Sequence, residues 1–174
     1  WASVNPFKLL QLTFGGSGYD VAVAQAKSAL FFTRNQYAPL VEPFRFDPPF
    51  KDQLYFVYLN QKQDSQKEVA AFNKGRKAAQ KEIDHISQIS ESITQTKSLD
   101  GFNKLLFTHE KLVGLILEQI PIKERLFSDF EGEIKSLGAW GGDFILATGK
   151  SSPNYFKEKG YATILPYSDI ISTQ

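Results

Sequence analysis

The first segment whose residue types could do chemistry is a glycine-rich turn, Gly16-Ser17-Gly18, that leads into a predicted helix containing Asp20. Such a turn presents backbone N–H groups that are not bonded within the helix, and the helix dipole favours negative charge there. The turn can therefore hold a phosphate, and the Asp20 carboxylate can take a proton from a substrate hydroxyl or orient it, as in phosphoryl transfer. The alternative is a capping box, Ser17-x-x-Asp20, in which the acid only satisfies backbone donors. The turn is neither a GxGxxG nor a Walker A motif, because no Gly-Lys-Ser/Thr follows it.

A second glycine-rich segment, Gly138-Ala139-Trp140-Gly141-Gly142-Asp143, lies between two predicted strands. Its three glycines allow the backbone to approach a ligand or another strand closely. Trp140 would either stack on a flat ligand or fill a gap in the core. For the bend as a whole, a tight β-turn without a ligand is the alternative.

Other catalytic chemistry has little support in the residue types. The chain has no cysteine, which removes disulfides, thiolate nucleophiles and cysteine-based zinc sites. His109 lies within an apolar stripe, where a partly buried histidine is expected, and Val113 stands where a zincin motif needs its second histidine. His85 falls on the polar side of its helix. We expect no metal ligands among these residues, and no G-x-S-x-G motif is present.

Composition limits the class of protein. The chain has 174 residues, of which 42% are hydrophobic and 22% charged, as in globular domains. A net charge of +1 gives the chain no overall positive potential that would attract nucleic acid or an anionic membrane. The apolar runs are too short to span a bilayer. We therefore expect a cytoplasmic protein without nucleic-acid or membrane partners. The sequence begins with Trp1 and contains no methionine, which predicts a piece of a longer product.

Two domains are predicted, residues 1–50 and 51–174, because Asp47-Pro48-Pro49 cannot continue regular structure. In the first, Asn5-Pro6 begins a helix expected to reach Phe14, and a second helix runs through Ala26. Strands are expected over 29–33 and 40–46, the latter at an edge because of Pro43.

After residue 51 the expected order is β-α-α-β-β-α-β. The strands are predicted at 53–59, 133–137, 144–147 and 161–165. Ile83, Ile86, Ile89 and Ile93 mark one helix, and Asp100 is expected to cap a second that Pro121 ends. The apolar stripe of the second helix is Phe102, Leu105, Leu106, His109, Leu112, Val113, Ile116 and Ile120. Residues 122–130 are ambiguous between a helical turn and a loop, and Ser152-Pro153 begins a short helix that Gly160 stops. Helices gathered on one face of an antiparallel sheet make an α+β fold.

Together the two glycine-rich segments resemble the GHMP kinases, which include galactokinase, homoserine, mevalonate and phosphomevalonate kinases. The run Gly16–Ala22 (GSGYDVA) is similar to the Gly-Ser-Gly-Phe-Asp-Val stretch of phosphomevalonate kinases and the Ser-Gly-x-Asp segment of mevalonate kinases. The run Lys135–Asp143 (KSLGAWGGD) is similar to the third family motif, Lys-Leu-Thr-Gly-Ala-Gly-Gly-Gly-Gly. The segment Lys104–Val113 resembles a family helix with an Asn/His-then-Leu pattern, and a bacterial branch with a Gly-Tyr-Asp-Ile-Ala signature is the nearest match, with Val21 in place of Ile.

The resemblance implies the end of the family's N-terminal domain followed by its ferredoxin-like C-terminal domain. It implies an ATP- and Mg²⁺-dependent kinase acting on an acceptor such as mevalonate or phosphomevalonate, with Asp20 as the base. Backbone donors of Gly16–Gly18 would contact acceptor or phosphate, and Gly138–Asp143 would close the phosphate pocket.

Two departures keep an alternative open. Trp140 and Asp143 stand where the family has glycine, and the family's nucleotide loop, Pro-x-x-x-Gly-Leu-Gly-Ser-Ser-Ala, is absent from this sequence. We therefore expect the segment alone to be inactive and the missing N-terminal part to be its partner. A non-catalytic pseudokinase or metabolite-binding module of the same fold is the alternative. A ferredoxin-like RNA-binding domain is not favoured, since the charge is near neutral and RNP-like aromatic strands are missing.

Overall fold

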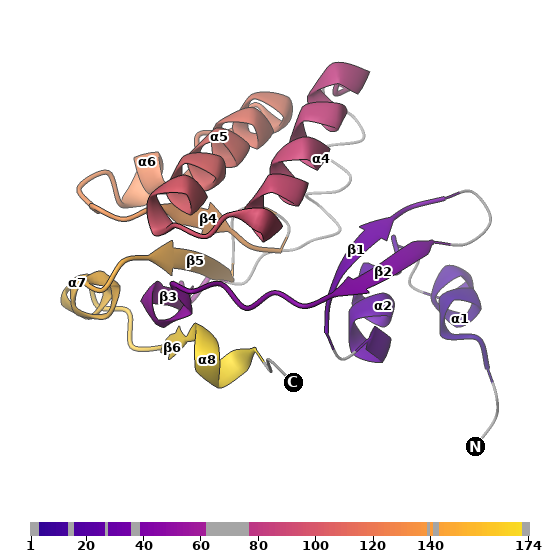
Figure 1. Ribbon diagram of the computed structural model, residues 1–174, viewed down its shortest axis with the longest axis horizontal. Coiled ribbons are helices and arrows are strands. Elements are labelled where there is room, and N and C mark those ends of the chain that lie inside the picture. Colours follow the sequence, from indigo (N-terminus) through magenta and orange to yellow (C-terminus); the bar gives the residue numbers. More distant parts are fainter. Residues whose placement is uncertain are drawn as a thin grey trace. The chain divides into compact units, whose positions relative to one another are not determined.

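The computed structural model describes residues 4–13, 16–26, 28–35, 39–61, 77–138, 140 and 143–171. The chain forms two units that divide between Asp47 and Pro48 (Figure 1). Each unit combines helices with an antiparallel sheet, so the fold class is α+β, as the sequence predicts.

The first unit is built from two short helices and a two-stranded antiparallel sheet. Its elements are α1 (Pro6–Leu12), α2 (Tyr19–Ala26), β1 (Ala29–Thr33) and β2 (Leu40–Phe44). The Asn5 side chain caps α1 by accepting hydrogen bonds from the N–H groups of Phe7 and Lys8, as its position before a proline predicts. The first helix ends at Leu12, and the expected endpoint at Phe14 lies outside the described residues. In the sheet, Pro43 of β2 lies opposite Leu30.

The second unit contains a four-stranded antiparallel sheet in the order β4-β5-β3-β6. The strands are β3 (Leu54–Tyr58), β4 (Ile134–Ser136), β5 (Phe144–Thr148) and β6 (Ile164–Pro166). The helical segments are η1 (Lys51–Gln53), α4 (Gln80–Gln95), α5 (Leu99–Leu117), α6 (Ile122–Leu126), α7 (Ser152–Glu158) and α8 (Tyr167–Ile170). The ambiguous segment 122–130 thus begins as the helix α6. The helix α8 was not expected, and it directly follows a last strand that starts three residues later than predicted.

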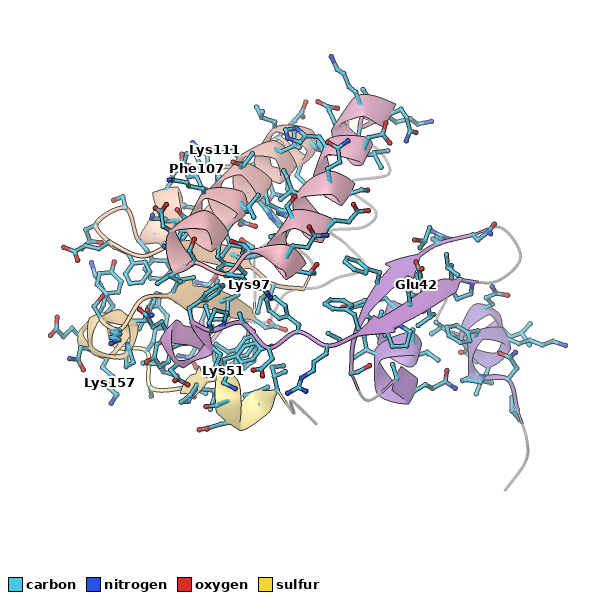
Figure 2. The ribbon with its side chains drawn as sticks, viewed as in Figure 1. Glu42, Lys51, Lys97, Phe107, Lys111 and Lys157 are labelled. Atoms are coloured by element: carbon cyan, nitrogen blue, oxygen red, sulfur yellow. The ribbon has the colours of Figure 1, made fainter. Side chains whose placement is uncertain are left out.

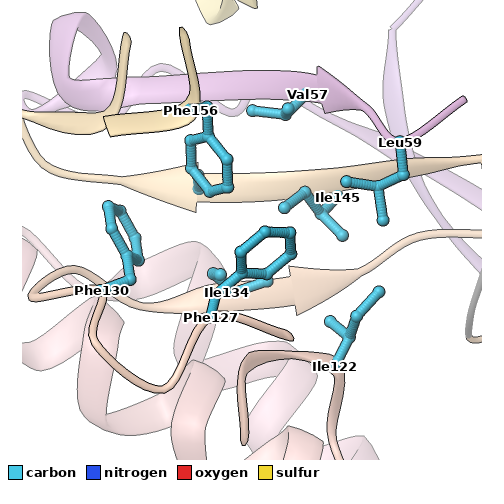
Figure 3. Packing of buried hydrophobic residues seen from close by; sticks show 9 residues of the cluster. Val57, Leu59, Ile122, Phe127, Phe130, Ile134, Ile145 and Phe156 are labelled. Carbon is cyan, nitrogen blue, oxygen red and sulfur yellow. The ribbon is translucent and has the colours of Figure 1, made fainter. Parts of the chain in front are cut away.

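One face of this sheet carries the main apolar core (Figure 3). Val57 lies opposite Ile145, and Ile134 lies opposite Ala147, so these side chains share a face because alternate strand residues point the same way. Aromatic rings cover them: Phe127 and Phe130 from the segment after α6, and Phe156 from α7. The segment after α6 is therefore fixed by its buried rings, which explains why it has a defined path without regular structure.

The longest described helix of the second unit is α5, with 19 residues. Its N-cap is Ser98, whose Oγ accepts a hydrogen bond from the Gly101 N–H, so the expectation that Asp100 caps the helix is wrong. Asp100 lies instead in the first turn and forms a 2.6 Å ion pair with Lys104. The helix ends at Leu117, before Pro121, and Ile120 is exposed rather than part of the buried stripe. Neither α5 nor any other helix in the described ranges is long and apolar enough to cross a membrane.

Figure 2 shows Phe107 and Lys111 together on α5. The Lys111 ammonium lies 5.6 Å from the centre of the Phe107 ring and forms a 2.6 Å ion pair with Glu124 of α6. Both side chains of this ion pair are nearly half exposed, so it contributes little to stability.

Candidate functional site

The Gly16–Asp20 segment of the first unit forms a turn that enters α2. Gly16 and Gly18 have φ values of +105° and +84°, which fall in the left-handed region that favours glycine. Ser17 Oγ accepts a 3.2 Å hydrogen bond from the Tyr19 N–H, so the serine satisfies one donor at the start of the helix. Asp20 is exposed in the first turn of α2. Ser17 thus bonds the Tyr19 N–H rather than the Asp20 N–H that a capping box would use, and the exposed Asp20 carboxylate is accessible to a ligand.

Gly18 is buried where the turn rests on α1. A Cβ atom at this position would lie 2.8 Å from Phe7 Cδ1, closer than real side-chain contacts allow. Glycine is thus required at position 18 by both its backbone conformation and its neighbour. This contact holds the turn against α1.

A hollow of about 640 Å³ lies within the first unit and includes the turn. Its volume falls within the range of small-molecule pockets. It is lined by Asn5, Phe7, Lys8, Leu10, Gln11, Gly16, Ser17, Gly18, Arg34, Asn35 and Pro39. Gly16, Ser17 and Gly18 are the three turn residues that the sequence identifies as phosphate-binding candidates.

The second glycine-rich bend is described at three of its six positions. Gly138 and Trp140 have φ values of +67° and +56°, and the Asp143 carbonyl accepts a 2.9 Å hydrogen bond from the Leu59 N–H. The candidates Ala139, Gly141 and Gly142 lie outside the described residues.

The Trp140 side chain is buried against α5. Its exposed fraction is 9%, and its Nε1–H donates a 3.3 Å hydrogen bond to Glu110 Oε1. A Cβ atom on Gly114 would lie 3.2 Å from Trp140 Cη2 and 2.8 Å from the Gln119 carbonyl oxygen, so the ring packs where α5 lacks a side chain. Of the two roles that the sequence leaves open for Trp140, filling a gap in the core has this contact in its favour.

Glu110 connects α5 to the outer edge of the sheet. Leu137 N–H donates to the Phe144 carbonyl of β5, so by alternation the N–H groups of Ile134 and Ser136 point away from β5. Glu110 Oε2 accepts hydrogen bonds from the Ser136 N–H (3.1 Å) and Oγ–H (2.8 Å). The carboxylate of a 3% exposed glutamate thus occupies the outward side of the terminal strand β4.

A second carboxylate occupies the same edge. Glu133 Oε1 accepts a 3.1 Å hydrogen bond from the Ile134 N–H, and its Oε2 lies 3.3 Å from Lys123 Nζ. The buried Thr148 hydroxyl accepts from the Glu133 N–H and donates to Asn103 Oδ1 of α5, both at 2.8 Å. The outer edge of β4 is therefore covered by two carboxylates, and α5 is bonded to the sheet at two places.

Lys135 and His109 complete the charged cluster around Glu110. Lys135 Nζ lies 3.3 Å from Glu110 Oε1 and 3.4 Å from His109 Nδ1, and His109 Nδ1 lies 3.7 Å from Glu110 Oε1. Burial alone would raise the pKa of Glu110, but the contact with His109, the charge of Lys135 and the hydrogen bonds from Ser136 outweigh burial. Together they lower the pKa of this carboxyl below its ordinary value of 4.5.

The lowered pKa of Glu110 predicts how stability depends on pH. The unfolded chain binds a proton at Glu110 more readily than the native chain does, so acid favours unfolding. The stabilisation is fully present above pH 4.5 and is lost as pH falls through the lower native pKa. Urea unfolding between pH 3 and 7 should show a steeper acid decline for the native chain than for Glu110→Gln. Parallel curves for the two proteins would contradict this role.

The predicted site residues belong to different units: Gly16–Asp20 to the first and Gly138–Asp143 to the second. Within the second unit, Glu110 and Lys135 are brought together with Trp140, and neither residue is among the candidate site residues predicted from the sequence, although Lys135 begins the run Lys135–Asp143. One signal was available for Glu110, since it is a buried charge on the side of α5 that carries Phe102 and Leu106. No group of three or more histidine, cysteine, aspartate or glutamate residues suited to a metal ion occurs in the part of the chain that the structure describes.

Comparison with solved structures finds the same fold in the Lin0012 protein from Listeria innocua. The TM-score is 0.69 at 15% sequence identity, over 92% of this chain and 56% of that protein. The chain therefore spans just over half the length of this structural neighbour. No protein-family model and no curated protein matches the sequence. The likeness shows a shared fold.

Proposed function

We propose that this chain is the C-terminal portion of a GHMP-type kinase, which transfers the γ-phosphoryl group of ATP to an alcohol or phosphate acceptor. The observation that carries the proposal is the placement of Asp20, exposed in the first turn of α2 and directly after a turn with two left-handed glycines. This placement suits a carboxylate that takes a proton from an acceptor hydroxyl while neighbouring N–H groups face a phosphate. The resemblance of Gly16–Ala22 and Lys135–Asp143 to family motifs supports the same assignment.

The architecture of the second unit supports the proposal at the level of the fold. Apart from its short helices η1, α6 and α8, its elements follow a β-α-α-β-β-α-β order, and the first strand, β3, lies between β5 and β6. This strand order is typical of ferredoxin-like sheets, with two long helices in place of one in the first crossover, and the family resemblance implies such a sheet for a C-terminal domain. Folds of this kind serve many functions, so the assignment of activity rests on the site residues.

In the proposed reaction the chain's own residues position the acceptor. Asp20 orients the hydroxyl and accepts its proton, and the Gly16–Gly18 backbone contacts acceptor or phosphate. Mg²⁺, which the family resemblance implies, would neutralise part of the phosphate charge. Mg²⁺ is commonly held by substrate phosphates and waters with few protein carboxylates, so it would be held mainly by the nucleotide, and Asp20 would stay free to accept the proton.

ADP production by the full-length protein tests the proposal. The assay should contain Mg-ATP and a panel of acceptors that includes mevalonate, phosphomevalonate, homoserine and sugars. We expect ADP release that depends on one acceptor. Binding of ATP without ADP release with any acceptor in the panel would contradict kinase activity toward these compounds.

The second candidate function is a non-catalytic module that binds a metabolite. One observation favours it: Trp140 replaces a family glycine, and its ring is buried and hydrogen-bonded to Glu110. A bend anchored in this way has less freedom to close over phosphates than one built from glycines alone. Acceptor binding without ADP production would support this second function over the first.

A further inference from the structure

The hollow in the first unit has an uneven charge. Among the described residues that line it, Lys8 and Arg34 are the charged ones, and none is a carboxylate. The whole chain is almost neutral, with 20 lysines and arginines against 19 aspartates and glutamates. The positive charge of the hollow is therefore a local feature and does not reflect the overall composition. Neither Lys8 nor Arg34 forms an ion pair with any residue that the structure describes.

Two neutral polar side chains of the hollow, those of Asn5 and Ser17, can donate hydrogen bonds to a ligand. Asn5 Oδ1 already accepts from the N–H groups of Phe7 and Lys8, which leaves its amide N–H₂ as the group available to a ligand. Ser17 Oγ accepts from the Tyr19 N–H, so its hydroxyl hydrogen is available as a donor. A site of two cations and several donors suits a ligand group that only accepts hydrogen bonds and carries negative charge.

We infer that this hollow binds the phosphate group of an acceptor that is already a phosphomonoester, with Lys8 and Arg34 as the residues that select it. A phosphomonoester carries a charge of about −1.5 to −2 at pH 7, which matches the two cations better than a carboxylate does. The apolar lining residues Phe7, Leu10 and Pro39 suit a short carbon skeleton beside the phosphate. Assigning the phosphate to the acceptor rests on the proposed function, because Asp20 follows the same turn and would act on the acceptor hydroxyl.

Calorimetric titration of the chain with glycerol 3-phosphate, acetate and glycerol tests the charge selection. We expect glycerol 3-phosphate to bind, and acetate and glycerol to bind at least about tenfold more weakly, because each charge-assisted hydrogen bond is worth about tenfold in affinity or more. Lys8→Ala and Arg34→Ala should each weaken glycerol 3-phosphate binding about tenfold, and raising the salt concentration should weaken it further. Equal binding of acetate, or binding that neither substitution changes, would overturn the inference.

Matched controls come from exposed cations outside the hollow. Lys157→Ala on α7 and Arg125→Ala on α6 remove the same charges from the second unit and should leave glycerol 3-phosphate binding unchanged (Lys157 is labelled in Figure 2). Lys8 and Arg34 are exposed, so their variants should keep the native thermal unfolding midpoint. If the control variants weaken binding as much as Lys8→Ala does, the phosphate is held by general charge and the inference fails.

A competition experiment identifies the source of the phosphate. ADP should not displace glycerol 3-phosphate if the hollow belongs to the acceptor, and displacement that depends on Lys8 and Arg34 would assign the hollow to the nucleotide instead. This readout needs no turnover. If no acceptor in the panel supports ADP release but glycerol 3-phosphate still binds through Lys8 and Arg34, the proposed function is contradicted and the anion-binding site is supported.

Discussion

Replacing Asp20 with asparagine is expected to lower kcat of the full-length kinase by a factor of about 10²–10⁴, the usual contribution of a general acid–base group. Asparagine keeps the size and one oxygen of the side chain but cannot accept the proton of the acceptor hydroxyl. The affinity for ATP should stay close to the native value, because the substitution leaves the backbone donors of Gly16–Gly18 in place. Steady-state ADP release with varied ATP and varied acceptor separates the two effects.

The matched control for this prediction is Asp100→Asn. Asp100 is also an exposed aspartate in the first turn of a helix, so its substitution reproduces the small loss of helix-dipole stabilisation. Its kcat should remain native. Native turnover in the Asp20→Asn enzyme would remove Asp20 from the reaction, and an equal loss in both variants would indicate a general effect of helix stability.

Replacing Glu110 with alanine is expected to lower the free energy of unfolding of the second unit by about 3–5 kcal/mol, the usual result of breaking a buried ion pair by removing one partner. The substitution removes the acceptor for the Ser136 N–H and hydroxyl and for the Trp140 indole N–H. It also leaves Lys135 without its carboxylate. Urea unfolding followed by circular dichroism measures the loss.

Two further variants separate the role of the charge from the role of the hydrogen bonds. Glu110→Gln retains an amide oxygen for the Ser136 donors and should lose less stability than Glu110→Ala. Glu124→Ala breaks the exposed pair with Lys111 and should change stability by less than about 1 kcal/mol. If Glu110→Ala is no more destabilising than Glu124→Ala, the Glu110 cluster contributes little to the fold.

Trp140 provides a local readout of the same substitution. The sequence has two tryptophans, Trp1 and Trp140, so a Trp1→Phe background isolates the buried one. In that background, Glu110→Ala should shift the Trp140 emission to longer wavelength, because the indole loses its acceptor and gains contact with water. An unchanged spectrum would mean that Glu110 does not hold this side chain in place.

Local pattern was sufficient to predict elements whose periodicity is strong. The aromatic run of β3 is placed within one residue, α5 ends three residues before the expected Ile120, and the α+β class follows from the order of elements. The cap of α5 was wrong because Asp100 and Ser98 are both good capping residues, and the backbone leaves the helix at Ser98. The short helix α8 has too few residues for a repeating pattern.

Contacts between distant residues explain what the sequence could not predict about the candidate sites. Glu110 meets Ser136 and Trp140, which follow it by 26 and 30 residues, and no local motif encodes that meeting. Lys8 and Arg34 line one hollow although one lies in α1 and the other follows β1. In contrast, Gly16, Ser17, Gly18 and Asp20 are neighbours in sequence, so their chemistry could be proposed from the sequence alone.

The two carboxylates along β4 also affect how copies of this chain meet one another. A terminal strand with unbonded N–H groups is a template on which a strand from another molecule can add, and such additions lead to aggregation. In this chain the outward N–H groups of Ile134 and Ser136 are already bonded to Glu133 and Glu110. An approaching strand would meet negative charge and no available donor at either residue. Glu110, which attaches α5 to the sheet, and Glu133 therefore also oppose the addition of a strand from another molecule at this edge.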